Sequence, residues 1–111
     1  MANKQQRIAS LIQKNITDII IFNMKNDLFR LVSVNSCDVS NDYSFAKVYV
    51  SHLEIEKVDH CVEELNKRKG MIRSELARRM DIYKVPELVF IKDDTYDKGE
   101  RIEQILKDLK K

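Results

Sequence analysis

The chain has 111 residues, with only two glycines, one proline, two cysteines and no tryptophan. So little glycine and proline excludes collagen-like and linker-like sequences. No apolar run approaches the roughly 20 residues that a membrane-spanning helix needs, and residues 1–6 are not followed by the hydrophobic core of a signal peptide. We therefore expect a cytoplasmic protein without a membrane segment. We expect Cys37 and Cys61 to be buried or half-buried thiols rather than a disulfide.

Charge is what the sequence has in abundance. Charged residues make up 34% of the chain. Apolar residues make up 43%, and this fraction is too high for a disordered chain. The length predicts a single domain over residues 1–111. The net charge is only +2, but residues 1–30 hold five basic and two acidic side chains, and residues 67–84 hold seven and two. Two such blocks can form the electrostatic footprint of a nucleic-acid-binding protein.

Apolar residues at three- and four-residue spacing predict four helices. The first begins at the N-cap Asn3 and ends near Met24, with Arg7 and Lys14 on the face away from the apolar stripe. The second and third helices are predicted around residues 55–65 and 72–80. A last amphipathic helix is predicted over about residues 95–110, where the apolar positions are Ile102, Ile105, Leu106 and Leu109.

Three strands complete the pattern. Alternating residues predict a strand around Lys47–Ser51, preceded by one over Leu31–Ser40 whose alternation slips, so that a bulge is expected near Asn35. The third strand, Leu88–Ile91, is apolar in both phases, which is typical of a strand that is central or covered on both faces. The order of elements predicts an α+β domain whose three-stranded sheet carries its helices on one face. A helix pair that returns to a third strand is the arrangement of the type II KH domain.

Two stretches of the sequence are distinctive. The first is the hairpin over residues 39–51, VSNDYSFAKVYVS. The second is GMIRSEL at residues 70–76, followed by VPELVF at residues 85–90. Together they resemble the bacterial ribosome-binding factor A family. The resemblance spans about residues 4–106 and includes Gly99-Glu100-Arg101-Ile102. One departure concerns the Ala-x-Gly kink that joins the helix pair in this family, because the matching residues here are Arg68-Lys69-Gly70.

The resemblance implies a ribosome assembly factor that is not an enzyme. Such a factor is a single KH-like domain that binds the free small (30S) ribosomal subunit, assists late maturation and 5′-end processing of its 16S rRNA, and is linked to growth in the cold. We expect a monomer without cofactor, metal or small-molecule substrate. Two alternatives remain open: a generic KH-like RNA-binding or translation-inhibiting module, and a protein-interaction domain whose charge only keeps it in solution.

The basic residues are the candidate RNA-binding site. Gly70 has no second glycine three residues later, so the Gly-x-x-Gly clamp of ordinary KH domains is not expected. Cations just before the third helix would instead add to the field of its N-terminus, which favours a phosphate. Gly70 itself is predicted to mark an angle between the two helices, where the backbone turns sharply or takes a positive φ. The alternative is one continuous helix over about residues 55–80. The candidate RNA-binding residues are Lys67, Arg68, Lys69, Arg73, Arg78, Arg79, Lys84, Arg7 and Lys14.

Other chemistry finds little support in the sequence. Tyr49 and Lys47 share the sheet face opposite Val48 and could stack on and pair with a nucleotide, although exposed strands often carry tyrosine. The adjacent His60 and Cys61 would point about 100° apart on a helix, so they do not form a base–nucleophile pair. We therefore expect no catalytic site.

Overall fold

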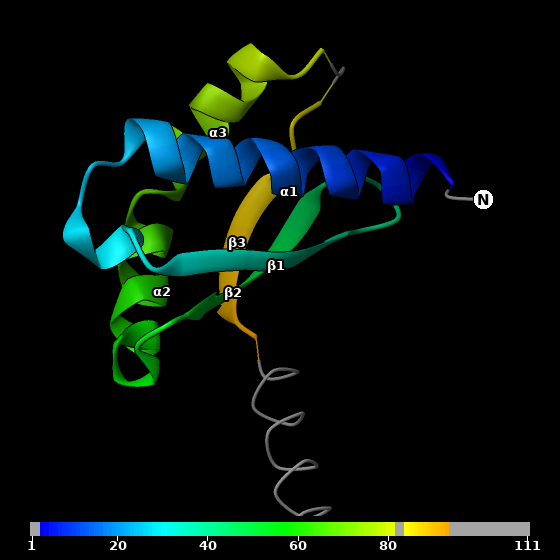
Figure 1. The fold of residues 1–111 in the computed structure, drawn as a ribbon. Coiled ribbons are helices and arrows are strands. Elements are labelled where there is room, and N and C mark those ends of the chain that lie inside the picture. The colour runs from blue at the N-terminus through cyan, green and yellow to red at the C-terminus, as the bar shows by residue number, and fades with distance from the viewer. Residues whose placement is uncertain (1–2, 82–83, 94–111) are drawn as a thin grey trace, which may run out of the picture.

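A computed structural model describes residues 3–81 and 84–93 of the chain. The last helix predicted, over about residues 95–110, lies outside these residues. Three helices pack on one face of a three-stranded sheet (Figure 1), so the α+β, KH-like prediction is confirmed. No helix of the described part is long and apolar enough to cross a membrane. The elements in order are α1 (Lys4–Asn23), the 3₁₀ turn η1 (Asp27–Phe29), β1 (Val32–Val39), β2 (Phe45–His52), the 3₁₀ turn η2 (Ile55–Lys57), α2 (Val58–Lys67), α3 (Lys69–Arg79) and β3 (Glu87–Lys92).

Helix α1 begins where the sequence predicts. The Asn3 side chain accepts a hydrogen bond from the Gln6 N–H at 2.8 Å, and the Gln6 side chain accepts one from the Asn3 N–H at 3.1 Å, which makes a capping box. The apolar stripe is buried at Ile12, Ile16, Ile19 and Ile20. Arg7 and Lys14 are exposed on the opposite side, as predicted.

The sheet contains the predicted bulge. Strands β1 and β2 are antiparallel, and their register shifts between Val34 and Ser36. The shift keeps Val34 and Val39 in the core and Cys37 partly buried against it. The Gln13 side chain of α1 donates to the carbonyls of Val34 and Asn35, at 3.1 Å each, and so ties the bulge to the helix.

Strand β3 pairs in parallel with β2, in the order β1-β2-β3. Within the described part of the chain it is therefore an edge strand covered on one face, not a central strand. Its outer edge is nevertheless occupied. The Asn66 side chain of α2 donates to the Phe90 carbonyl and accepts from the Phe90 N–H, both at 2.9 Å, as a neighbouring strand would. This pairing fixes α2 against β3 and shields the strand edge.

The helix pair breaks near Gly70, as predicted, but not because of glycine. Helix α2 ends at Lys67, Arg68 leaves the helical conformation at φ −104° and ψ 8°, and α3 resumes at Lys69. No glycine among the described residues has a positive φ, so a positive φ at Gly70 was a wrong expectation, and the turn lies at Arg68 instead. Gly70 lies in the first turn of α3, and a Cβ added there would meet nothing within 4 Å.

Candidate nucleic-acid interface

The fold brings the two basic segments of the sequence onto neighbouring helices. Helices α1 and α3 pack against each other (Figure 1), and the Arg79 guanidinium of α3 donates to the Asn23 side chain of α1 at 3.0 Å. Both helices bury one face in the common core, so their basic residues lie on the outer surface of the helical layer. We call the exposed faces of α1 and α3, with Arg68 between α2 and α3, the helical surface.

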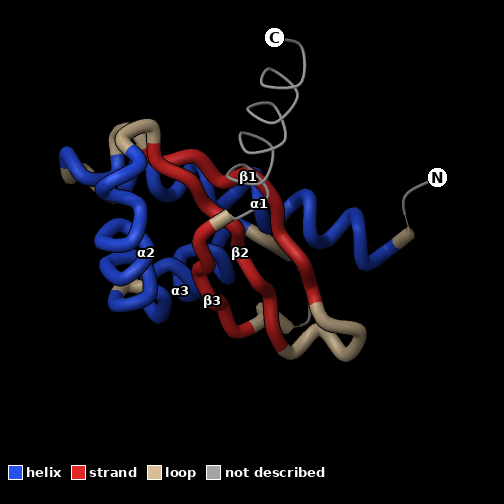
Figure 2. Tube along the Cα trace, turned by 90° about the horizontal axis from the view of Figure 1, so that it is seen from below, coloured by secondary structure: helices blue, strands red, loops and turns tan. Residues whose placement is uncertain are grey.

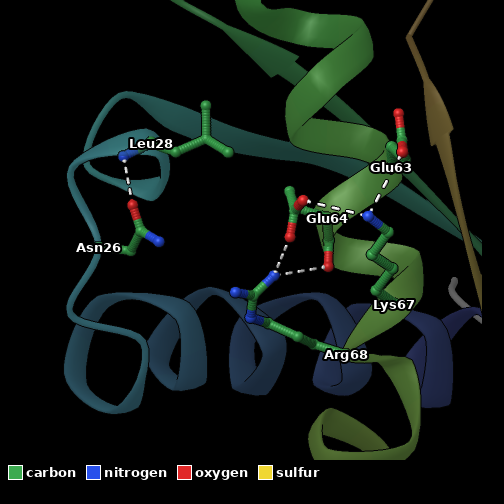
Figure 3. A network of polar contacts seen from close by, with 6 residues as sticks. All are labelled: Asn26, Leu28, Glu63, Glu64, Lys67 and Arg68. Atoms are coloured by element: carbon green, nitrogen blue, oxygen red, sulfur yellow. Dashed lines mark hydrogen bonds and ion pairs between the residues drawn. The ribbon is translucent and has the colours of Figure 1, made fainter.

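Two of the predicted cations contact carboxylates of α2 (Figure 3). Arg68 Nη1 lies 2.5 Å from Glu64 Oε2 and 3.1 Å from the Glu64 carbonyl oxygen, with its guanidinium carbon 5.4 Å from the centre of the Phe29 ring. Lys67 Nζ lies 3.4 Å from Glu64 and 3.5 Å from Glu63. The hydrogen bond from Arg68 lowers the pKa of the Glu64 carboxyl, with a further contribution from Lys67. Arg68 therefore holds the end of α2, whereas Lys67, with a side chain that is 61% exposed, is only loosely paired.

Four further cations also have partners within the fold. Arg73 donates to the Val85 carbonyl at 2.9 Å and so ties α3 to the approach of β3. Arg78 lies 2.8 Å and Arg79 3.8 Å from the Glu75 carboxylate, which offsets part of their charge. Lys84 Nζ is 3.4 Å from the Ser44 hydroxyl. Arg78 remains largely exposed, and it is the member of this group that an external phosphate reaches most easily.

Three predicted cations keep all their donors available. Among residues 3–81 and 84–93, no hydrogen bond or ion pair engages the side chains of Arg7, Lys14 or Lys69. Arg7 and Lys14 stand on the outer face of α1, while Lys69 opens α3 beside the exposed Gly70. The sequence prediction missed Lys4, the first residue of α1, and Lys25, two residues after its end, which also have no side-chain partner in the described part. They stand alone in the sequence, so only their place at the ends of an amphipathic helix could have indicated them.

The two cysteines and His52 are enclosed by the fold and do not form a reactive site. Cys37 and Cys61 are free thiols, and burial raises their pKa values to about 12 and about 11. His52 is buried, with Nε2 2.9 Å from the Leu28 carbonyl and Nδ1 accepting from the Glu54 N–H at 3.0 Å. No group of three His, Cys, Asp or Glu side chains in the described ranges is placed to hold a metal ion.

The fold and the helical surface define a small α+β protein of the KH-like class with cations gathered on its helices. A family model described as ribosome-binding factor A matches residues 4–106. The chain belongs to this family.

Known relatives agree in length and in fold. The chain is 38% identical to ribosome-binding factor A of Macrococcus caseolyticus over 98% of its own length and 96% of that protein. It is also similar to the crystal structure of ribosome-binding factor A from Thermus thermophilus, with a TM-score of 0.71 and 21% identity over 81% of this chain and 97% of the other. A homology model of Thermus thermophilus ribosome binding factor A, fitted into a cryo-electron-microscopy map of a 30S complex of that protein, gives a TM-score of 0.69 at 20% identity. The match covers 81% of this chain and 96% of the other.

Proposed function

We propose that this protein binds the free small ribosomal subunit by placing its helical surface against the phosphates of 16S rRNA. The observation that carries the proposal is the convergence of the two basic sequence segments on α1 and α3, with Arg7, Lys14 and Lys69 available on them. The Thermus relative fitted into a 30S complex supports the small subunit as the partner.

The finer proposal is that the protein acts in the cytoplasm as a monomer in late maturation of the subunit, including processing of the 5′ end of 16S rRNA and growth in the cold. Such a role needs no catalytic group. A protein that binds one conformation of the rRNA more tightly than another shifts the population toward that conformation by the difference in binding free energy. Membership of the family supports this role.

Salt dependence tests the phosphate contacts. Each phosphate that a cation neutralises adds about −0.7 to −0.9 to the slope of log K against log salt concentration. We expect purified protein to sediment with 30S subunits, and its affinity to fall steeply as salt is raised from about 50 to 200 mM. Equal binding to large and small subunits would support the generic RNA-binding alternative, and a flat salt response would exclude phosphate contacts.

A matched pair of variants tests the location. Changing Arg7, Lys14 and Lys69 together to Gln removes three cations without breaking a contact in the described part of the chain. With at least about 1 kcal/mol for each charge-assisted contact, we expect the affinity for 30S to fall roughly 100-fold. The control triple removes the same charge elsewhere, at Arg30, Lys47 and Lys57, and also gives up the exposed ion pairs of Arg30 with Asp27 and of Lys57 with Glu54. Equal losses in the two triples would mean that net charge alone drives binding.

A further inference from the structure

A recess lies where α1 ends and the chain turns back through η1 into β1 (Figure 1), with an open volume of about 390 Å³. Ile20, Met24 and Phe29 line it from the core, where all three are buried. Ile21 also lines it and is 60% exposed. The volume is in the range of small-ligand sites, about 300–1,000 Å³, and the apolar lining suits a flat apolar group.

Hydrogen-bond acceptors gather at the same end of α1. The last four carbonyls of a helix have no partner within it. At the end of α3 the Met80 N–H meets part of this need, because it donates to the Leu76 carbonyl at 2.9 Å. At the end of α1, no donor from outside the helix, among residues 3–81 and 84–93, reaches the carbonyls of residues 20–23. Ile20 and Ile21 both line the recess, so an external N–H donor finds acceptors there.

An amide donor and a free cation complete the recess. The Asn26 side-chain carbonyl accepts from the Leu28 N–H at 2.9 Å (Figure 3), and no described residue accepts a hydrogen bond from its amide nitrogen. Lys25 likewise has no side-chain partner in the described part. The Asp27 carboxylate is 97% exposed, and Arg30 at 3.7 Å offsets part of its charge. The recess therefore joins an apolar lining to a donor, several oxygen acceptors and a cation.

A nucleotide needs this combination, because its phosphate pairs with a cation, its base edge with donors and acceptors, and its base face with apolar groups. We propose that the recess binds the base of one unpaired nucleotide of the rRNA, with Lys25 on an adjoining phosphate. The inference rests on the proposed function and adds to its phosphate contacts one contact that depends on the base. The acceptors outnumber the amide donor, which favours bases with an amino group, adenine, cytosine and guanine, over uracil.

The sheet is the other place with exposed aromatic residues. Figure 2 shows the strands in front of α1, and on this face Phe45 and Tyr49 of β2 alternate with core residues. Lys47 lies between them. Asp38 of β1 pairs with Lys47 and Glu87 of β3 pairs with Phe45, so these carboxylates would repel a phosphate backbone. Charge therefore favours the recess over the sheet as the place for a nucleotide.

Hexanucleotides test the proposal on the full chain, with binding followed by fluorescence anisotropy at low salt. An abasic hexamer carries the same phosphates as a cytidine hexamer but no bases. We expect the cytidine hexamer to bind at least about five-fold more tightly than the abasic hexamer, and the uridine hexamer to fall between them. Equal affinities for the cytidine and abasic hexamers would overturn the proposal.

Three variants locate the contact. Ile21→Gln removes exposed apolar lining without a change of charge, so the advantage of the cytidine hexamer should fall below about two-fold while the abasic affinity stays the same. Leu53→Gln is the matched control, because Leu53 is 78% exposed and does not line the recess, and it should keep the full advantage. Lys25→Gln should weaken both hexamers alike and reduce the salt slope by about 0.7.

Other results would contradict the proposal and show what replaces it. An advantage lost in Tyr49→Leu but kept in Ile21→Gln would place the base on the sheet. Tighter binding of a tetra-arginine peptide than of the cytidine hexamer would mean that the acceptors take a basic protein segment. Sedimentation with 30S subunits separates this inference from the proposed function. Binding to 30S without a cytidine advantage overturns the recess alone, and no binding to 30S or to any hexamer overturns both.

Discussion

Replacing Gly70 with alanine should stabilise the protein. Gly70 lies in the first turn of α3 without a positive φ, and the added Cβ would meet nothing within 4 Å. No steric cost therefore opposes the gain in helix propensity, which is about 1 kcal/mol in a helix interior. Because Gly70 lies in the first turn, we expect the substitution to raise the free energy of unfolding by about 0.5–1 kcal/mol. For a chain of this size that corresponds to a rise in Tm of about 2–6 °C.

The assay is thermal and urea denaturation followed by circular dichroism. Ala77→Gly is the control, because Ala77 is exposed in the same helix and the reverse exchange should cost a similar amount. A Gly70→Ala protein that is less stable by about 1 kcal/mol or more would refute the reasoning. It would mean that the α2–α3 junction depends on a conformation that only glycine adopts.

The same substitution separates stability from binding. Gly70 is exposed beside Lys69 at the start of α3, and a phosphate that contacts Lys69 there would also face the N–H groups of the first turn. A methyl group that costs nothing inside the free protein would then lie between the backbone and the phosphate. We expect Gly70→Ala to melt higher and to bind 30S subunits more weakly. Unchanged binding would place the phosphate contacts elsewhere on the helical surface.

Two further predictions concern hydrogen bonds. The Ser44 N–H, followed by the hydroxyls of Ser40 and Ser44, lowers the pKa of Asp42 to about 2. The pKa of this carboxyl in the unfolded chain is near 4. The carboxylate therefore contributes stability that is present above about pH 4 and lost as the pH falls toward 2. Urea midpoints measured against pH should show that Asp42→Asn lacks this loss. Asn66→Ala leaves the Phe90 N–H and carbonyl without their partner and should cost about 1–3 kcal/mol in urea denaturation; a cost under about 0.5 kcal/mol would contradict the strand-like pairing.

Features encoded within one segment could be predicted from the sequence. Helix α1 has its apolar stripe and its capping residues in consecutive positions, so periodicity and the Asn3 signal were sufficient. The bulge in β1 was predictable for the same reason. A slip of one residue moves every later side chain to the other face, and only an extra residue near Asn35 returns Cys37 and Val39 to the core side.

Which cations remain available could be predicted only in part. Arg79 pairs with Asn23, 56 residues away, and Arg73 with the Val85 carbonyl, 12 residues away, so these partners depend on the fold. Arg68 and Glu64 differ, because they are four residues apart on one helix, where opposite charges meet. That contact was readable from the sequence. The net charge of residues 67–84 does not reveal it, because Glu63 and Glu64 lie just before that segment.

The departure at Arg68 therefore has a different consequence from the one its charge suggests. Counted alone, an arginine at the family's alanine position adds a cation to the RNA-binding surface. In the fold, its guanidinium is held by the Glu64 carboxylate and carbonyl and covers the Phe29 ring. A partly exposed ion pair contributes little by itself, whereas the hydrogen bond to a helix-terminal carbonyl and the contact with a buried ring fix the end of α2 against η1. Under the proposed function, the cation available to rRNA at this junction is therefore Lys69 rather than Arg68.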